Sequence, residues 1–159
     1  MPGTWRHLAA RFFSVLGAPP LTDDERRRVA ELLRPAEVGP FFAQQDMDQR
    51  HALEAATRVA EVLPGRTDLE RAALLHDIGK RHARLGVLGR VLASVAAKVG
   101  LRVRGRFRAY LEHGPAAADE LTGLGAEPVV VAFARHHHGA RPDGIPANDW
   151  DTLKRADTT

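Results

Sequence analysis

The adjacent residues His76 and Asp77 constrain the fold of this chain more than any other feature of its sequence. They follow an apolar run, Ala72-Ala73-Leu74-Leu75, which predicts the end of a buried helix. A charged group persists inside a protein only where it is paired or coordinates a metal. Candidate partners occur elsewhere along the chain, and they are His51, His113, the run His136-His137-His138 and Asp157. Nitrogen and oxygen ligands of these types suit Mn, Fe, Zn or Mg.

The length and composition of the chain predict a single cytoplasmic domain. Its 159 residues are enough to bury a core, and none of them is cysteine. Because cysteine is absent, a disulfide framework and a thiolate metal site are excluded, and a cytoplasmic location is expected. Arg11 interrupts the short apolar stretch near the N-terminus, and no run approaches the roughly 18 apolar residues of a membrane span. We therefore expect neither a signal peptide nor a membrane partner.

Positive charge is concentrated in one part of the chain. The formal net charge is only +3, but residues 78–111 include nine Lys or Arg residues and no acidic residue. This asymmetry predicts an anionic partner more strongly than the net charge does. Residues 102–108, where basic residues alternate with others, would also suit a nucleic acid, although no known nucleic-acid-binding motif accompanies them. The sequence does not indicate an oligomeric state.

Apolar residues recur at helical spacing along the chain and predict an all-α domain. Thr22 and Glu25 form a capping box that opens one helix, which stops before Pro35. Pro115 is expected to begin a new helix, and Asp157 shares one face of the last helix with Trp150. The helices are expected over residues 5–16, 22–34, 42–63, 67–79, 87–99, 107–112, 115–121 and 127–136 and at the C-terminal end.

The histidines and aspartates form a convincing set only when they are considered together. A single histidine near an apolar stripe is more often a hydrogen-bonded core residue than a ligand, and His7 and His82 are assigned to that class. The other candidates each occur where a helix meets the core or ends, which packing alone does not explain. They are His51, His76, Asp77, His113, His136 and Asp157.

The order of these residues resembles that of the HD superfamily of metal-dependent phosphohydrolases, and the resemblance covers residues 47–157. The segment Leu74-Leu75-His76-Asp77-Ile78-Gly79-Lys80 is similar to the characteristic motif of that family, and Leu153-Lys154-Arg155-Ala156-Asp157 resembles its closing motif. The chain is most similar to the small stand-alone bacterial proteins of the HDIG type. The resemblance implies a single-domain helical bundle with a metal site in its core, and we assign this domain to residues 41–159. Residues 1–40 lie outside the resemblance and are expected to form a helical extension, which could complete the core, cover the site or pair two subunits.

The resemblance also implies two divalent metals. The first would be held by His51, His76, Asp77 and Asp157, and the second by Asp77, His113 and His136, with His137 as a further candidate. Asp77 would bridge the two metals, because a carboxylate has two oxygens whereas a neutral imidazole offers one free nitrogen. Phe133, one turn before His136, favours His136 over its neighbours, and His138 is expected to be solvated.

The implied function is hydrolysis of a phosphate ester or anhydride, such as that of a nucleotide, by metal-activated water. Asp77 and Lys80 would be the catalytic residues, with Lys80 binding an oxygen of the phosphate. Lys80 could instead be a cation that compensates a helix C-terminus. Two other functions use the same features, and these are an HD-fold mixed-valent diiron oxygenase of a small alcohol and a non-catalytic basic binding module with a structural metal.

Overall fold

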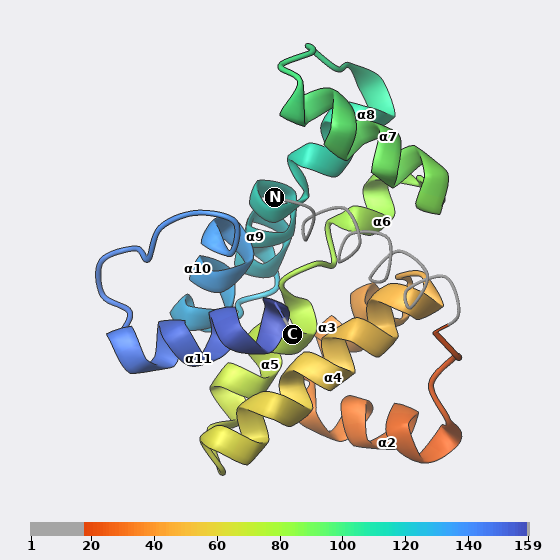
Figure 1. Cartoon of the computed structure of the whole chain (residues 1–159). Helices are drawn as coiled ribbons and strands as arrows, with labels where there is room; N and C mark the ends of the chain where they lie inside the picture. Colours follow the sequence, from red (N-terminus) through yellow and green to blue (C-terminus); the bar gives the residue numbers. More distant parts are fainter. Residues whose placement is uncertain (1–17, 159) are drawn as a thin grey trace, which may run out of the picture.

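The computed structural model describes residues 18–158, and this part of the chain is an all-α domain without strands (Figure 1). The helix expected over residues 5–16 lies outside the described residues. The helices are α2 (Asp23–Leu32), α3 (Pro35–Phe42), α4 (Asp46–Val62), α5 (Thr67–Leu75), α6 (Lys80–Ala83), α7 (Val87–Lys98), α8 (Gly105–Leu111), α9 (His113–Gly123), α10 (Pro128–His136) and α11 (Ala147–Thr158).

The expected start of the second helix is confirmed, but the long helix expected over residues 42–63 is wrong at its beginning. The side chain of Thr22 accepts a hydrogen bond from the backbone of Glu25, and the Glu25 carboxylate accepts one from the backbone of Thr22. Further along, α3 ends at Phe42 and α4 begins at Asp46. The side-chain amides of Gln44 and Gln49 donate to the carbonyls of Phe41 and Gln44, at 3.2 and 2.9 Å. These bonds stabilise the break, because they satisfy carbonyls that a continuous helix would bond internally.

The helix α5 is the centre of the main core. It packs against α4, α10 and α11, and α2 also contacts it. Leu69, Leu74, Leu75 and Ile78 are fully buried, as is His76. The prediction that His76 and Asp77 close a buried helix is therefore confirmed.

The described part of residues 1–40 belongs to the same core as the rest of the chain. Val29 of α2, Leu33 at the end of α2, and Phe41 of α3 are buried in the main hydrophobic cluster. A boundary between residues 40 and 41 would divide α3. The described part of residues 1–40 therefore helps to complete the core of the domain.

The helices α6, α7 and α8 form a smaller unit at one end of the molecule (Figure 1). Its apolar cluster contains Ala83, Leu85 and Ala93, with Phe107 and Tyr110 packed against it. The short α6 joins this unit to the end of α5 through the turn at residues 76–79. None of the described helices combines the length and the apolar composition needed to cross a membrane.

Candidate metal centre

The candidate ligands come together from five parts of the fold. His51 lies on α4, His76 and Asp77 begin the turn after α5, and Asp157 lies on α11. His113 is the first residue of α9, and His137 directly follows α10. Two groups of side chains result, one on each side of the Asp77 carboxylate.

The first group contains His51, His76, Asp77 and Asp157. Oδ1 of Asp157 lies 3.1 Å from Nε2 of His51 and 3.1 Å from Nε2 of His76. Oδ2 of Asp77 lies 3.3 Å from the same Nε2 of His76. The ligand atoms of His51, His76 and Asp77 lie within 4.8 Å of one another, which is close enough for a single ion.

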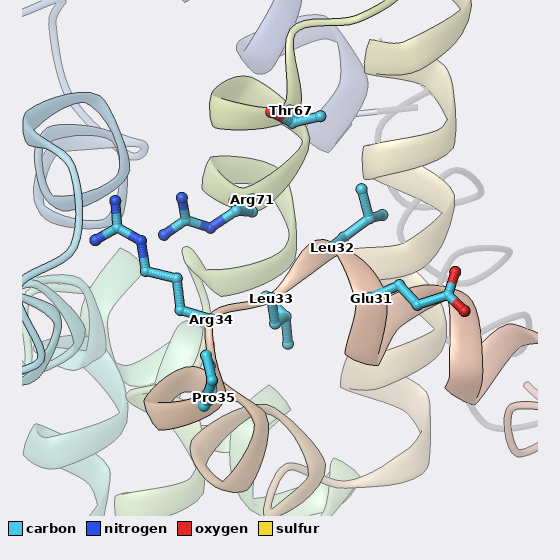
Figure 2. Close-up of a pocket in the computed structure, with 7 residues that line it drawn as sticks. All are labelled: Glu31, Leu32, Leu33, Arg34, Pro35, Thr67 and Arg71. Carbon is cyan, nitrogen blue, oxygen red and sulfur yellow. The ribbon is translucent and has the colours of Figure 1, made fainter.

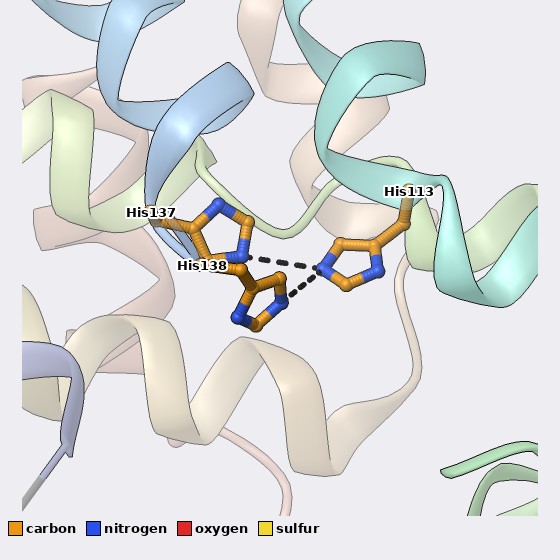
Figure 3. A group of neighbouring side chains, drawn as sticks. All are labelled: His113, His137 and His138. Atoms are coloured by element: carbon orange, nitrogen blue, oxygen red, sulfur yellow. Dashed lines mark hydrogen bonds between the residues drawn. The ribbon is translucent and has the colours of Figure 1, made fainter. Parts of the chain in front are cut away.

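The second group contains His113, His137 and His138 (Figure 3). Nε2 of His113 lies 3.2 Å from Nε2 of His137 and 3.2 Å from Nε2 of His138. Oδ1 of Asp77 completes this group, at 3.0 Å from Nε2 of His113 and 3.5 Å from Nε2 of His137. The two oxygens of Asp77 therefore face different groups of histidines.

Three of these histidines share the same backbone contact. Nδ1 of His76, His113 and His137 lies 2.8, 2.5 and 2.8 Å from the carbonyl oxygen of the residue three positions earlier. Because a carbonyl can only accept a hydrogen bond, Nδ1 carries the hydrogen, and Nε2 of a neutral ring is left with its lone pair. Metal-binding histidines commonly have this arrangement, in which the outer nitrogen donates to a backbone carbonyl.

The ring nitrogens of the second group need a cation when the rings are neutral. In that state the lone pairs of His113 and His137 face each other across 3.2 Å, and neither nitrogen can donate to the other. The buried Oδ1 of Asp77 accepts no hydrogen bond from the described residues. A divalent cation would satisfy all three atoms at once, so the residues present fit a metal centre.

The charges at the two groups differ. Burial opposes ionisation of Asp77, but His76 and Lys80 hold its pKa well below the usual value. Burial lowers the pKa of His76, but Asp77 and Asp157 outweigh it and raise that pKa to about 10. Burial lowers the pKa of His138 to about 4 and also lowers that of His137. His137 and His138 therefore offer neutral nitrogens at pH 7, whereas a cation bound in the first group would displace a proton from His76.

The structure differs from the expectation about which residue of the run His136-His137-His138 points inward. His136 is exposed and belongs to neither group, whereas His137 is 1% exposed and adjoins Asp77. The reason is helical phase, because His137 lies four residues after Phe133 and donates its backbone N–H to the Phe133 carbonyl at 2.8 Å. His138 is exposed, as the sequence predicts, and its ring nitrogen also lies 3.2 Å from Nε2 of His113.

Lys80 is the basic side chain that contacts the Asp77 carboxylate. It is the first residue of α6, and its ammonium group donates to Oδ2 of Asp77. Burial disfavours its charge, but Asp77 and Asp48 outweigh burial and hold the pKa of Lys80 above its usual value. Lys80 is therefore charged beside the carboxylate that separates the two groups.

Two supporting contacts were not foreseen from the sequence. Arg90 forms a buried bidentate pair with Asp48, with nitrogen–oxygen distances of 2.6 and 2.7 Å. Lys154 donates to the carbonyl oxygen of His137 and so anchors the end of α10 to α11. The place of Lys154 in the closing motif could have indicated that it lies near the centre. No pattern in the sequence distinguishes Asp48 as a partner of Arg90.

Gly79 and Gly114 allow the segments of the centre to approach one another. A Cβ atom on Gly79 would lie 2.1 Å from the carbonyl oxygen of His113, and one on Gly114 would lie 2.9 Å from that of Ala134. Real Cβ atoms essentially never come this close to backbone. Glycine after the His76–Asp77 pair is therefore required by packing against α9.

A pocket of about 420 Å³ lies away from the centre, between α2, α3 and α5 (Figure 2). Its charged lining includes Arg34 and Arg71. Both guanidinium groups already contact Glu127, and Arg71 also donates to the buried Glu37 at 2.6 Å. These pairs connect α3, α5 and the start of α10 and leave little free charge for a ligand.

Comparisons of the chain with models of known protein families, with curated proteins and with solved structures find no match. The chemistry of the candidate centre is thus the main basis for a functional proposal.

Proposed function

We propose that this chain is a metal-dependent phosphohydrolase that acts on a phosphate ester or anhydride of a nucleotide. The observation that carries the proposal is the position of Asp77, whose two oxygens face separate groups of histidines at 3.3 and 3.0 Å. One carboxylate between two sets of nitrogen donors suits a pair of cations. Paired cations are a common solution for phosphoryl transfer.

The two groups of side chains define which residues would hold each metal. His51, His76, Asp77 and Asp157 would hold one, and Asp77, His113, His137 and His138 would hold the other. Divalent cations there would lower the pKa of water toward 7 and polarise a phosphoryl group. The absence of cysteine favours Mn, Fe, Mg or Zn with nitrogen and oxygen ligands.

The residues of the chain itself would bind and orient the phosphate. Lys80 is charged and adjoins Asp77, so its ammonium group can turn from that carboxylate to a non-bridging oxygen of a phosphate. A charge-assisted contact of this kind typically contributes ~1.5–3 kcal/mol. Arg90 is less suited to this role, because both of its terminal nitrogens are bound to Asp48. Lys80 is therefore the residue proposed to bind the substrate.

The deciding experiment is a substrate screen on the full chain loaded with Mn, Fe, Mg or Zn. The panel contains nucleoside monophosphates, cyclic and linear dinucleotides, dinucleoside polyphosphates and simple phosphomonoesters. Release of phosphate or nucleotide by the loaded chain, and its loss in Asp77→Ala, is the expected result. A metal-loaded chain that hydrolyses no member of the panel would contradict the proposal.

The same samples separate the two other functions. Oxygen consumption in the presence of small alcohols by the iron-loaded chain would favour a diiron oxygenase. A chain that holds metal, consumes no oxygen and releases no phosphate would favour a binding module with a structural metal. Lys80 and the acid-free segment that follows it support a phosphate ligand over both of these.

A further inference from the structure

The helix α7 carries its large apolar side chains on its exposed face. Leu88, Leu92, Val95 and Val99 follow one another at intervals of four, three and four residues and therefore share one side of the helix. Their exposed fractions range from 45% to 69%. We call these four residues, together with Val91, the α7 face.

The side of α7 that packs against the protein buries only Ala93 and Arg90, the second of which pairs with Asp48. Ala93 is fully buried in the cluster with Ala83 and Leu85. Gly89 lies so close to Leu85 that a Cβ on it would be 3.1 Å from the Leu85 side chain. An ordinary surface helix has the opposite arrangement, with large apolar residues inward and polar residues outward. Packing within the chain therefore does not account for the α7 face.

Exposed apolar side chains are concentrated in this part of the molecule. Among the described residues, seven of the eight large exposed apolar side chains lie within residues 88–111, and Val62 of α4 is the exception. Figure 1 shows α7 and α8 at one end of the molecule, on its outer surface. Apolar patches of this kind mark sites that bind a protein or a membrane.

The same unit carries basic side chains that have no acidic partner. Of the nine basic residues within residues 78–111, four pair with Asp77, Glu120, Asp48 and Glu112, and Arg106 donates to a backbone carbonyl. The remaining four form no ion pair with the described residues, and all of them are exposed. They are Arg84, Lys98, Arg102 and Arg104.

We propose that the α7 face and these four basic residues bind the surface of an anionic lipid bilayer. Aliphatic side chains would enter the boundary between headgroups and acyl chains, while the arginines and Lys98 would contact anionic headgroups. A helix of this type lies on a membrane without crossing it, so the proposal agrees with the lack of a spanning helix in the described residues. It revises the expectation of no membrane partner, which considered only spans and signal peptides.

The combination of positive charge and exposed apolar side chains favours a bilayer over other occupants. A second copy of the chain would place one acid-free basic surface against another. Residues 1–17 as an occupant would repel this surface in the same way, because they contain basic residues but no acidic ones. A nucleic acid would use the basic residues but would leave the exposed Leu and Val side chains without a role. A bilayer uses both.

The test is flotation of the full chain with vesicles of phosphatidylcholine alone and with vesicles containing phosphatidylglycerol. We expect binding only to the anionic vesicles, and we expect it to weaken as salt concentration rises. Leu92→Asp should weaken binding about tenfold or more, since it places a carboxylate among the inserted side chains. The matched control is Val62→Asp, which makes the same change on α4, outside the α7 face, and should bind like the unaltered chain.

A second pair of variants tests the charges. Arg102→Glu should weaken binding about fivefold or more, whereas Arg28→Glu on α2 changes the net charge equally and should have little effect. Circular dichroism of each variant excludes loss of helix as the cause. The proposal is overturned if anionic vesicles are not bound, if neutral vesicles bind equally well, or if the control variants weaken binding as much. Two further outcomes, in a chain that binds no vesicles, would overturn the proposal. One is a dimer that Leu92→Asp abolishes, and the other is oligonucleotide binding that Leu92→Asp leaves intact.

Discussion

Oδ1 of Asp77 lies 3.0 Å from Nε2 of His113, and a neutral His113 ring has no hydrogen on this nitrogen to donate to the carboxylate. Nδ1 of His113 donates to the carbonyl of Tyr110 at 2.5 Å, so in the neutral ring the lone pair is on Nε2. The carboxylate is ionised, because nearby positive charge holds its pKa well below the usual value despite burial. Two acceptors held this close in a buried site are stable only with a cation between or beside them.

Asp77→Ala should remove both metals together, because the two oxygens of Asp77 face different groups, at 3.3 Å from Nε2 of His76 and 3.0 Å from Nε2 of His113. The measurement is elemental analysis of protein purified without chelator, for which we expect one to two metals per unaltered chain. His113→Ala should empty only the second group. A full metal complement in Asp77→Ala would show that this carboxylate does not bridge.

His137→Ala and His136→Ala should differ in metal content. His137 is buried beside Asp77, so its loss should lower the affinity of the second group for metal by about ten- to a hundredfold. His136 is exposed, and its replacement should leave the metal content unchanged. Calorimetric titration of each variant with Mn or Zn measures the two affinities. Equal losses of affinity in both variants would restore His136 as a candidate ligand.

Lys80→Ala should retain metal but lose phosphohydrolase turnover by roughly ten- to a thousandfold. The reason is that its ammonium group adjoins Asp77, where charge would develop on the equatorial phosphate oxygens. A loss of kcat as well as affinity is expected if the contact strengthens in the transition state. Arg84→Ala is the control, because Arg84 is exposed beyond α6. Unchanged kinetics in Lys80→Ala would exclude a role for Lys80 in the reaction.

Gly79→Ala should destabilise the chain by about 3 kcal/mol, because the new methyl group would collide with the backbone of His113. The displaced His113 should also weaken metal binding at the second group. Gly86→Ala is a matched control, since both glycines precede the first turn of a helix but nothing lies within 4 Å of a Cβ on Gly86. Chemical denaturation with and without metal gives both quantities, and similar stabilities would refute the packing role.

Glu25→Gln should lower stability at neutral pH but not in acid. Hydrogen bonds from Arg50 and Thr22 lower the pKa of Glu25 from 4.5 to about 2. The folded state therefore gains stability from the carboxylate above pH 4.5, and the gain is lost as the pH falls toward 2. Because the pair is partly exposed, we expect only about 1 kcal/mol, or 2–4 °C in Tm. Melting curves across this range should converge in acid, and Glu31→Gln should show no such difference.

The parts of the fold that depend on local pattern were predictable. The apolar run before His76 required a buried helix end, and Thr22 with Glu25 required a helix start, and both are present. The break between α3 and α4 was not foreseen, because the hydrogen bonds of Gln44 and Gln49 to the backbone have no sequence signature. The sequence also predicted a helix over residues 87–99, but it could not indicate that nothing in the described chain covers the large apolar side chains of this helix.

The site was harder to predict than the helices that carry it. Identifying His51, His76, Asp77, His113 and Asp157 needed only residue type and order, and the structure brings these side chains together. Choosing among three consecutive histidines needed the rotational phase of the last turn of α10, which depends on how that turn packs. Phe133 proved to lie beneath His137 rather than His136, with ring centroids 6.0 Å apart.

The hydrogen-bonded side chains of His51 and Asp157 are separated by 106 residues of sequence. A cation bound to both side chains would close almost the whole domain into one loop. The arrangement of the helices in space would then be held by the cation as well as by the core. Metal binding then favours the folded state over any partly folded one, because no local segment contains a complete set of ligands. A protease cut in the exposed stretch at residues 139–144 would break the chain but leave α11 joined to α4 through the metal.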